Sequence, residues 1–145
     1  MTLNARIENV KYKPAFRDVV TQRSLIIADG FYEWKWQVSK RKNKVKYEIC
    51  IPNNELFTLV GFYATWKNPQ TNEIVNSYTI LTTEANPLMA EIHNIKNRMP
   101  IILQPEDEIE WLSQEPLEKY AFPYSVSLIA SRISNDSNPQ SQLLF

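Results

Sequence analysis

The sequence has little of several residue types on which common functional sites depend. Its 145 residues include one cysteine, one histidine and two glycines. A single cysteine excludes an internal disulfide framework and a cysteine-rich metal site, and it fits a reducing compartment. No apolar run approaches the roughly 20 residues of a membrane span, and the first residues are not those of a signal peptide. We therefore expect a soluble intracellular protein, and the sequence suggests no metal and no cofactor.

The chain also lacks an excess of either charge. Lys plus Arg and Asp plus Glu are balanced at 16 each, so no overall field attracts the protein to nucleic acid. Any site for a polyanion must be a local patch. Hydrophobic residues make up 43% of the chain, which is enough for the core of one globular domain spanning residues 1–145.

Short runs of branched and aromatic residues, separated by turn residues, predict strands joined by hairpins. The predicted strands are Leu25–Ile27, Phe31–Trp36, Tyr47–Ile51, Leu56–Trp66, Val75–Leu81, Arg98–Leu103 and Tyr124–Ala130. The fold class we expect is α+β and β-rich, a mainly antiparallel sheet or open barrel with short helices. Residues 131–145 are rich in Ser, Asn, Asp and Pro and predict a loose C-terminal tail.

Both glycines have an expected role. Asp29-Gly30 is predicted to form the turn of a hairpin between Leu25–Ile27 and Phe31–Trp36. Gly61 interrupts a long apolar run, which indicates a bulge or a close backbone approach.

The run Phe31–Trp36 contains the first candidate catalytic group. Alternation along a strand puts Phe31, Glu33 and Lys35 on one face. The other face then carries Tyr32, Trp34 and Trp36. A partly desolvated Glu33 would suit acid/base chemistry, whereas a solvated Glu on an edge strand is an equally good interpretation.

The single histidine follows a predicted short helix. Asn86 can cap this helix and Pro87 can occupy its first position, so that His93 lies at its end. Histidine suits proton transfer near neutral pH, although a lone histidine is more often structural. A second helix is predicted over Pro105–Leu112, with acidic residues in its first turn.

Two segments could contact an anion. Asn4 and Arg6 point the same way if the chain is extended there, although polar residues near a terminus are more often simply solvated. The segment 39–46 carries five positive charges near Trp34 and Trp36. Such a combination offers stacking surface and phosphate neutralisation for single-stranded nucleic acid, although a solvated turn is the commoner explanation. Cys50 is expected to be a small buried hydrophobe rather than a nucleophile.

Taken together, these residues resemble the SOS response-associated peptidase (SRAP) family of abasic-site processing proteins. The resemblance covers nearly the whole chain and depends on motifs that follow in the family's order. They are Asn4-Ala5-Arg6, Pro14-Ala15-Phe16-Arg17, Ala28-Asp29-Gly30-Phe31-Tyr32-Glu33-Trp34, Leu81-Thr82-Thr83-Glu84-Ala85-Asn86, Ile92-His93, Arg98-Met99-Pro100 and Ser134-Asn135-Asp136.

The resemblance implies binding of single-stranded DNA with abasic sites and reaction with the ring-opened aldehyde, as part of the DNA damage (SOS) response in the bacterial cytosol or nucleoid. It implies catalytic roles for Asn4, Glu33 and His93. An amide would orient the sugar, a carboxylate would relay protons to and from an attacking amine, and a histidine would assist ring opening. The DNA-binding residues implied are Arg6, Arg17, Trp34, Thr82 and Arg98.

The chain departs from the family in two places. In the family, a cysteine after the initiator methionine captures the aldehyde through its amine and thiol, but this chain begins only three residues before Asn4. We therefore expect an N-terminally truncated domain without the cysteine crosslink, which would associate with itself or with a complementing N-terminal chain. The second departure is the four residues that separate His93 from Arg98, where many family members have about one.

Three functions stay open at this point. After removal of Met1, the α-amine of Thr2 could form a Schiff base with the aldehyde and act as a lyase. A non-catalytic module for single-stranded nucleic acid would keep only the basic segment and the tryptophans. A peptidase or other hydrolase would use Glu33 and His93 without an evident nucleophile, and the family's name favours that activity.

Overall fold

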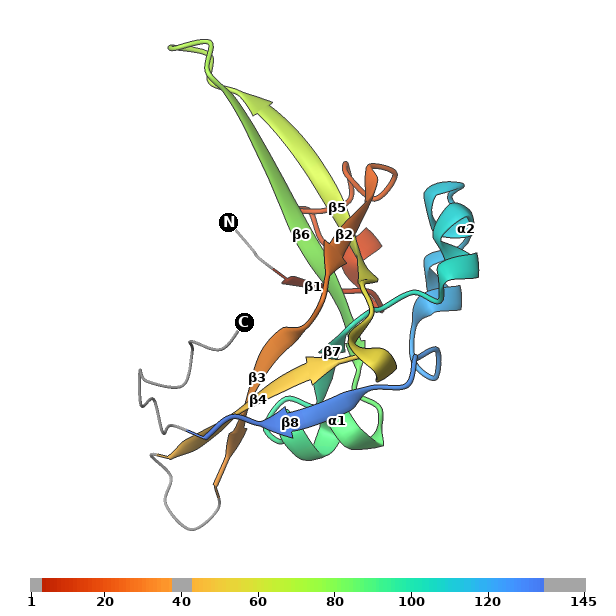
Figure 1. Cartoon of the computed structure of the whole chain (residues 1–145). Coiled ribbons are helices and arrows are strands. Elements are labelled where there is room, and N and C mark those ends of the chain that lie inside the picture. The colour runs from red at the N-terminus through yellow and green to blue at the C-terminus, as the bar shows by residue number, and fades with distance from the viewer. Residues whose placement is uncertain (1–3, 38–42, 135–145) are drawn as a thin grey trace, which may run out of the picture.

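The computed structural model describes residues 4–37 and 43–134, which form two β-sheets with short helices around them (Figure 1). The larger sheet has the order β1-β6-β5-β2, with β7 also paired to β6, and the smaller has the order β3-β4-β8. The strands are β1 (Asn4–Arg6), β2 (Arg23–Ala28), β3 (Phe31–Trp36), β4 (Lys44–Cys50), β5 (Phe57–Lys67), β6 (Ile74–Glu84), β7 (Arg98–Pro100) and β8 (Ile129–Arg132). Apart from the parallel pair β1–β6, every strand pair is antiparallel. The α+β, β-rich prediction is confirmed, and in the described residues both sheets stay open.

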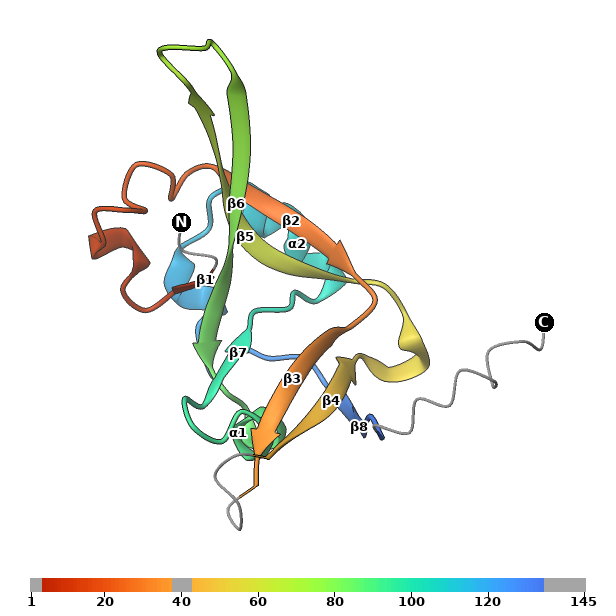
Figure 2. The same ribbon diagram turned by 90° about the vertical axis from the view of Figure 1, so that its left-hand side faces the viewer.

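Strands β5 and β6 form a long hairpin that extends beyond the rest of the molecule as an arm (Figures 1 and 2). Their pairing runs without interruption from Gly61 opposite Ile80 to Lys67 opposite Ile74. A Cβ at Gly61 would lie 2.4 Å from the carbonyl oxygen of Thr79 and 2.7 Å from Cδ1 of Ile26. The predicted close backbone approach at this glycine is therefore confirmed, and the strand has no bulge there.

The predicted hairpin at Asp29-Gly30 is wrong. Strand β2 pairs with β5 in the larger sheet, whereas β3 pairs with β4 in the smaller one. A tight two-residue turn needs a positive φ at a central position, and Gly30 does not have one. The chain instead bends at this point and passes from one sheet to the other. Gly30 lies close to β4, because a Cβ there would be 3.1 Å from the carbonyl oxygen of Ile49.

The two faces of the larger sheet pack against different partners. The face that carries Val60, Phe62 and Leu81 is buried, with Phe62 stacked on Trp111 at 6.1 Å between ring centroids. We call it the Phe62 face. The opposite face, which we call the Tyr63 face, includes Ile80. Around Leu59 it packs against Phe31 of the smaller sheet and against Ile51 and Leu128, which flank that sheet's strands.

The two α-helices are short. Helix α1 (Pro87–Ile92) begins as predicted, because the Asn86 side chain accepts a hydrogen bond from Met89 N at 2.9 Å. Helix α2 (Glu108–Leu112) follows a 3-10 turn, Pro105–Asp107, in the segment predicted to be helical. None of the helices in the described residues is long and apolar enough to cross a membrane.

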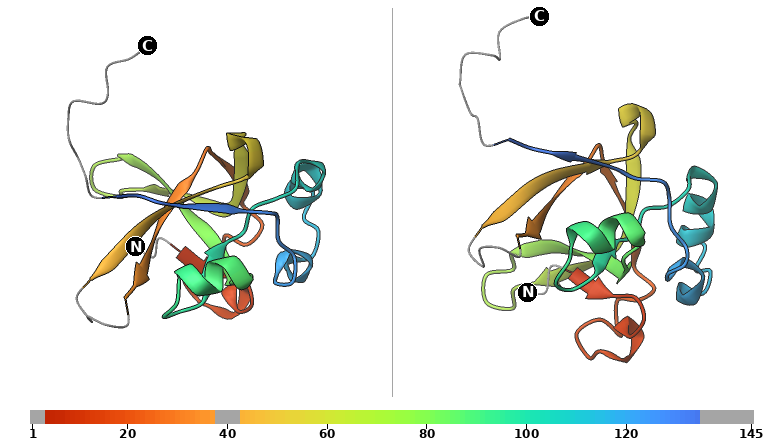
Figure 3. Two further views of the ribbon diagram at one scale, coloured as in Figure 1. Left: turned by 60° about the horizontal axis from the view of Figure 1, so that its bottom comes forward. Right: turned by 90° about the horizontal axis from the view of Figure 1, so that it is seen from below.

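Two predicted strands are shorter or displaced in the structure. Strand β7 ends at Pro100, after which only an isolated bridge joins Ile102 to Leu59. The last strand, β8, begins at Ile129 rather than at Tyr124 and runs along β4 (Figure 3). The Tyr124 hydroxyl instead accepts a hydrogen bond from Gln104 N and donates one to Asp107, which holds this segment near α2. The predicted tail begins at residue 131, but residues 131 and 132 belong to strand β8. Residues 135–145 lie outside the described part of the chain.

Candidate active site and nucleic-acid interface

Asn4 and Arg6 lie on one face of β1, with the buried Ala5 between them on the other. The parallel pairing places Asn4 opposite Ile80 and Arg6 opposite Thr82. Paired residues point to the same side of a sheet, so Asn4, Arg6 and Thr82 share the Tyr63 face. This confirms that the Asn4 and Arg6 side chains point the same way.

Asn4 and Arg6 also line a shallow groove beside the N-terminal turns. Lys13 adds a second cation to its lining, which also includes Phe16. Arg17 follows Phe16 in the chain and is about two-thirds exposed, with Nε 3.5 Å from the Asp18 carboxylate. The groove therefore combines an amide with positive charge, as an anionic strand requires.

Glu33 lies on the inner face of β3, which packs against α1. Only 23% of its side chain is exposed, and Oε2 is 3.8 Å from Nδ1 of His93. Its Oε1 accepts a hydrogen bond from Trp34 N. On the same face, Lys35 forms an ion pair with Glu91 of α1 at 2.6 Å. Strand β3 is at the edge of its sheet, as one interpretation of the sequence expected, but Glu33 is largely shielded from solvent.

His93 is held in one orientation by its neighbours. Its Nδ1 is 2.8 Å from the carbonyl oxygen of Arg98. A carbonyl oxygen can only accept a hydrogen bond, so Nδ1 carries the proton in the neutral ring and Nε2 keeps its lone pair. His93 thus has a nitrogen ready for proton exchange while the ring stays beside Glu33.

The four residues between His93 and Arg98 form a turn that returns the chain to the site. Asn97 has a positive φ of 50°, and its N–H donates to the His93 carbonyl at 2.9 Å. The Asn94 side chain accepts from Trp36 N and donates to Trp36 O, at 3.2 and 3.0 Å. These extra residues therefore bring Arg98 beside His93, and Asn94 binds β3 at its last residue, Trp36.

Arg98 connects the histidine to β1. Its guanidinium donates two hydrogen bonds to Glu8, both 2.9 Å long, and also donates to the carbonyl and hydroxyl oxygens of Thr82. Thr82 in turn donates to the carbonyl of Ala5 at 3.2 Å. A continuous series of contacts therefore runs from Glu33 through His93, Arg98 and Thr82 to the strand that carries Asn4 and Arg6.

Glu8 is a site residue that sequence reasoning missed. Burial opposes its ionisation, but the hydrogen bonds from Arg98 prevail and hold the pKa of this carboxyl below its usual value. The Arg98 side chain is mostly buried, and Glu8 balances its charge. In the sequence, only the alternation of Asn4, Arg6 and Glu8 could have placed Glu8 on the same face as the other two. That signal is weak because β1 ends at Arg6.

Trp34 lies on the outer face of β3, opposite to Glu33. It is 43% exposed and Tyr32 is 50% exposed. Lys46 of the neighbouring strand extends over both rings, 3.7 Å from the Tyr32 centroid and 5.8 Å from that of Trp34. Of the predicted basic segment, residues 39–42 lie outside the described part of the chain, and Lys44 and Lys46 belong to β4. This face offers aromatic surface and positive charge together.

Cys50 lies away from these residues at the end of β4. It is only partly buried, and its Sγ is 3.3 Å from Oδ1 of Asn54. Within residues 4–37 and 43–134, no group of three or more His, Cys, Asp or Glu side chains could hold a metal ion.

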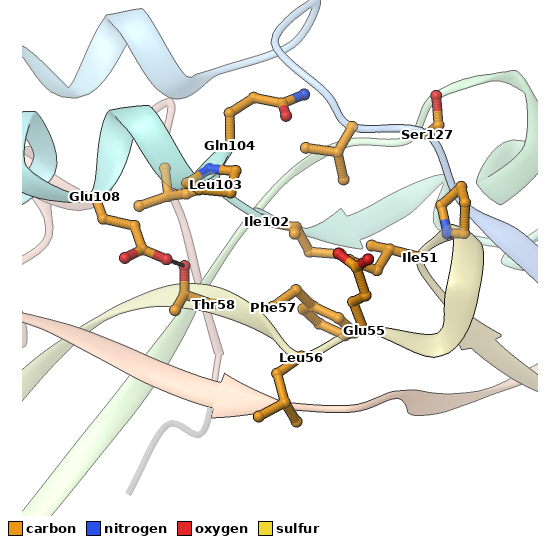
Figure 4. Close-up of a pocket in the computed structure, with 13 residues that line it drawn as sticks. Ile51, Glu55, Leu56, Phe57, Thr58, Ile102, Leu103, Gln104, Glu108 and Ser127 are labelled. Atoms are coloured by element: carbon orange, nitrogen blue, oxygen red, sulfur yellow. Dashed lines mark hydrogen bonds between the residues drawn. The ribbon is translucent and has the colours of Figure 1, made fainter.

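A separate pocket lies between β5 and the segment that leads to α2 (Figure 4). Its floor is apolar and includes Phe57, Ile102 and Leu103, whereas its walls carry the carboxylates of Glu55 and Glu108. Thr58 donates a hydrogen bond to Glu108 at 2.9 Å. None of the predicted site residues lines this pocket, and its two carboxylates would repel a phosphate backbone.

The chain is similar to proteins of known family over most of its length. The model of the family "SOS response associated peptidase (SRAP)" matches residues 1–138. "Abasic site processing protein YoqW" of Bacillus subtilis is 42% identical over 112 residues, which cover 77% of this chain and 47% of that protein. YoaM of the same organism, also named an abasic site processing protein, is 36% identical over 98% of this chain and 65% of its own length.

The fold is also found in solved structures. A crystal structure of a Bacteroides thetaiotaomicron protein superimposes with a TM-score of 0.81 at 32% identity, covering 94% of this chain and 60% of that one. The present chain thus spans about half to two thirds of the length of these relatives. By the extent of the family match and by these identities, the chain belongs to the SRAP family.

Proposed function

We propose that this chain acts on abasic sites in single-stranded DNA in the cytoplasm. The observation that supports the proposal is the series of contacts from Glu33 and His93 through Arg98 and Thr82 to β1, the strand that carries Asn4 and Arg6. The names of the relatives support the substrate, since several are abasic site processing proteins.

The chemistry needs a proton acceptor and a proton donor, and the site has a group for each. When a primary amine of this chain attacks the aldehyde carbon of the open sugar, a C–N bond forms and the C=O π bond breaks, and Glu33 passes the proton that the nitrogen loses to the carbonyl oxygen. The resulting carbinolamine then loses its hydroxyl as water, with a further proton supplied through His93, to give a protonated Schiff base. Asn4, on β1 of the larger sheet, would orient a hydroxyl of the open sugar.

The DNA backbone would pass close to β1 and β3. Arg6, Lys13 and Arg17 border the groove beside β1 and would contact phosphates. Because β3 is an edge strand, a DNA strand can cross its edge and place a base on Trp34 while the abasic sugar faces Glu33. Thr82 lies between the two regions. The Arg98 guanidinium would reach a phosphate only after its two hydrogen bonds to Glu8 break.

The test is incubation of the chain with single-stranded DNA that carries one abasic site, beside the same DNA with no lesion, followed by a denaturing gel. With borohydride, a Schiff base becomes a stable adduct, so a shifted band is expected for the abasic DNA alone. Strand cleavage without borohydride would identify lyase activity. Absence of both, together with equal binding of the two DNAs, would contradict the proposal.

A non-catalytic binding module is the second candidate. The exposed rings of Tyr32 and Trp34 under Lys46 favour it, because such a surface binds single strands without regard to a lesion. It predicts salt-sensitive binding with equal affinity for abasic and intact DNA. No adduct and no cleavage on the denaturing gel, together with equal affinity for the two DNAs in fluorescence anisotropy, would therefore favour this second function over the first.

A further inference from the structure

We propose that Tyr63 and Tyr78 form a stacking platform for the bases on one flank of the abasic site. The inference rests on the proposed function and adds a base-binding subsite on the β5–β6 arm. The two tyrosines are directly opposite one another in the hairpin and are 48% and 58% exposed.

The pairing of the arm puts the two tyrosines on the same face. Residues directly opposite in an antiparallel pair have Cα atoms about 5 Å apart, with side chains on the same face. Two exposed tyrosines on paired strands therefore present aromatic surface on one face of the arm. Bases of any identity can stack on such a surface, since each has a π-face.

The platform is continuous with the proposed active site. Tyr78 is two residues from Ile80 along β6, a distance of about 7 Å along an extended strand. Ile80 is opposite Asn4, and the next position on this face, Thr82, is opposite Arg6. Tyr63, Tyr78, Asn4 and Arg6 therefore share one face of the larger sheet, and a strand bound at Asn4 and Arg6 can run out along the arm.

The charge on this face suits a polyanion. Beyond the tyrosines it carries Thr65, hydrogen-bonded to Asn76 at 2.8 Å, and then Lys67 opposite Ile74. From Lys67 to Arg6, the described residues of this face include no carboxylate. A phosphate backbone would thus meet a cation at each end of the tyrosine pair and no like charge between them.

The experiment uses single-stranded oligonucleotides with one abasic site and a fluorescent 2-aminopurine at one, two or three positions on either flank. Stacking on an aromatic ring quenches 2-aminopurine, so quenching is expected on one flank only. Tyr63→Ala and Tyr78→Ala should each restore the fluorescence and weaken binding at least about fivefold. Tyr63→Phe and Tyr78→Phe, which keep the ring, should bind as the unchanged chain does.

Trp66 supplies a matched control. It lies on the same arm, is 56% exposed and points to the opposite face, because it follows Tyr63 by an odd number of residues. Trp66→Ala should leave binding and quenching unchanged. If Trp66→Ala removes the quenching while Tyr63→Ala and Tyr78→Ala do not, the platform is refuted, although the proposed function stands.

Two other results would also overturn the proposal. The first is measured by sedimentation without DNA. A dimer abolished by Tyr63→Ala would show that the tyrosines bind a second copy of this chain instead of bases. If the unchanged chain binds neither abasic nor intact DNA, both the platform and the proposed function fail. Binding to both DNAs without quenching on either flank refutes the platform alone.

Discussion

The two faces of β3 carry different chemistry although their residues alternate along a single short strand. On the inner face, Glu33 is largely shielded and lies beside His93, whose ring is held by the Arg98 carbonyl. On the outer face, Tyr32 and Trp34 are exposed beneath Lys46. The inner face has few exposed atoms and fixed hydrogen bonds, which suits proton transfer. The outer face has broad aromatic surface, which suits binding that tolerates any base. In the proposed function, the inner face carries out the chemistry and the outer face contributes binding affinity.

The largest expected effect comes from breaking the inner face alone. Glu33→Gln keeps an oxygen that can accept from Trp34 N but removes the proton acceptor. The rate of borohydride-trapped adduct on abasic DNA should fall by about 100-fold or more, because general acid/base catalysis contributes a factor of that size. Binding of intact DNA, measured by fluorescence anisotropy, should not change. Glu91→Gln, on an exposed carboxylate of α1, is the control and should react normally.

Arg98 tests whether the inner face depends on its anchor. Arg98→Met removes hydrogen bonds to Glu8 and Thr82 and should lower the free energy of unfolding by about 2 kcal/mol, the order expected for bonds to a charged group. Arg17→Met is the matched control. Its guanidinium is about two-thirds exposed, so a change below about 0.5 kcal/mol is expected in urea titrations. Equal losses in the two variants would mean that Arg98 is no structural anchor.

A change on the outer face should affect DNA binding and leave the reaction rate intact, which is the reverse of what Glu33→Gln should do. Trp34→Ala should weaken binding of both abasic and intact single-stranded DNA by about fivefold or more, as loss of a stacked base does. Once the DNA is saturating, the trapping rate should be close to that of the unchanged chain. Tyr12→Ala, on an aromatic ring elsewhere on the surface, should bind normally. A selective loss for abasic DNA would show that the two faces do not act separately.

The smallest effect is a pH dependence of stability that originates at Glu8. Arg98 lowers the pKa of this carboxyl in the folded state from its usual value near 4.5. The stabilisation is therefore fully present above that value and is lost as the pH falls through the folded-state pKa. In urea unfolding, the difference between the unchanged chain and Glu8→Gln should shrink below about pH 4.5. A difference that stays constant from neutral to strongly acidic pH would contradict the assignment.

Part of this arrangement could be predicted from the sequence because it depends on local patterns. Alternation along β3 correctly separated Glu33 from Trp34, and the Asn86 cap correctly placed His93 at the end of α1. The close approach at Gly61 followed from a glycine inside an apolar run.

The rest depends on contacts between distant segments. Asp29-Gly30 has the composition of a tight turn, but the chain bends there because β2 and β3 find their partners in different sheets. The bidentate pair between Glu8 and Arg98 joins residues 90 positions apart, and no local pattern marks it. Asn94 was predicted only as part of an extra segment, yet it binds the backbone of Trp36.

The most direct test is a crystal structure of the chain with single-stranded DNA that contains a tetrahydrofuran analogue of the abasic sugar. The account predicts the sugar ring beside Glu33, His93 and Asn4, with Arg6 on a neighbouring phosphate. DNA bound only to the outer face, with an intact base against Trp34 and the sugar analogue away from Glu33, would contradict it.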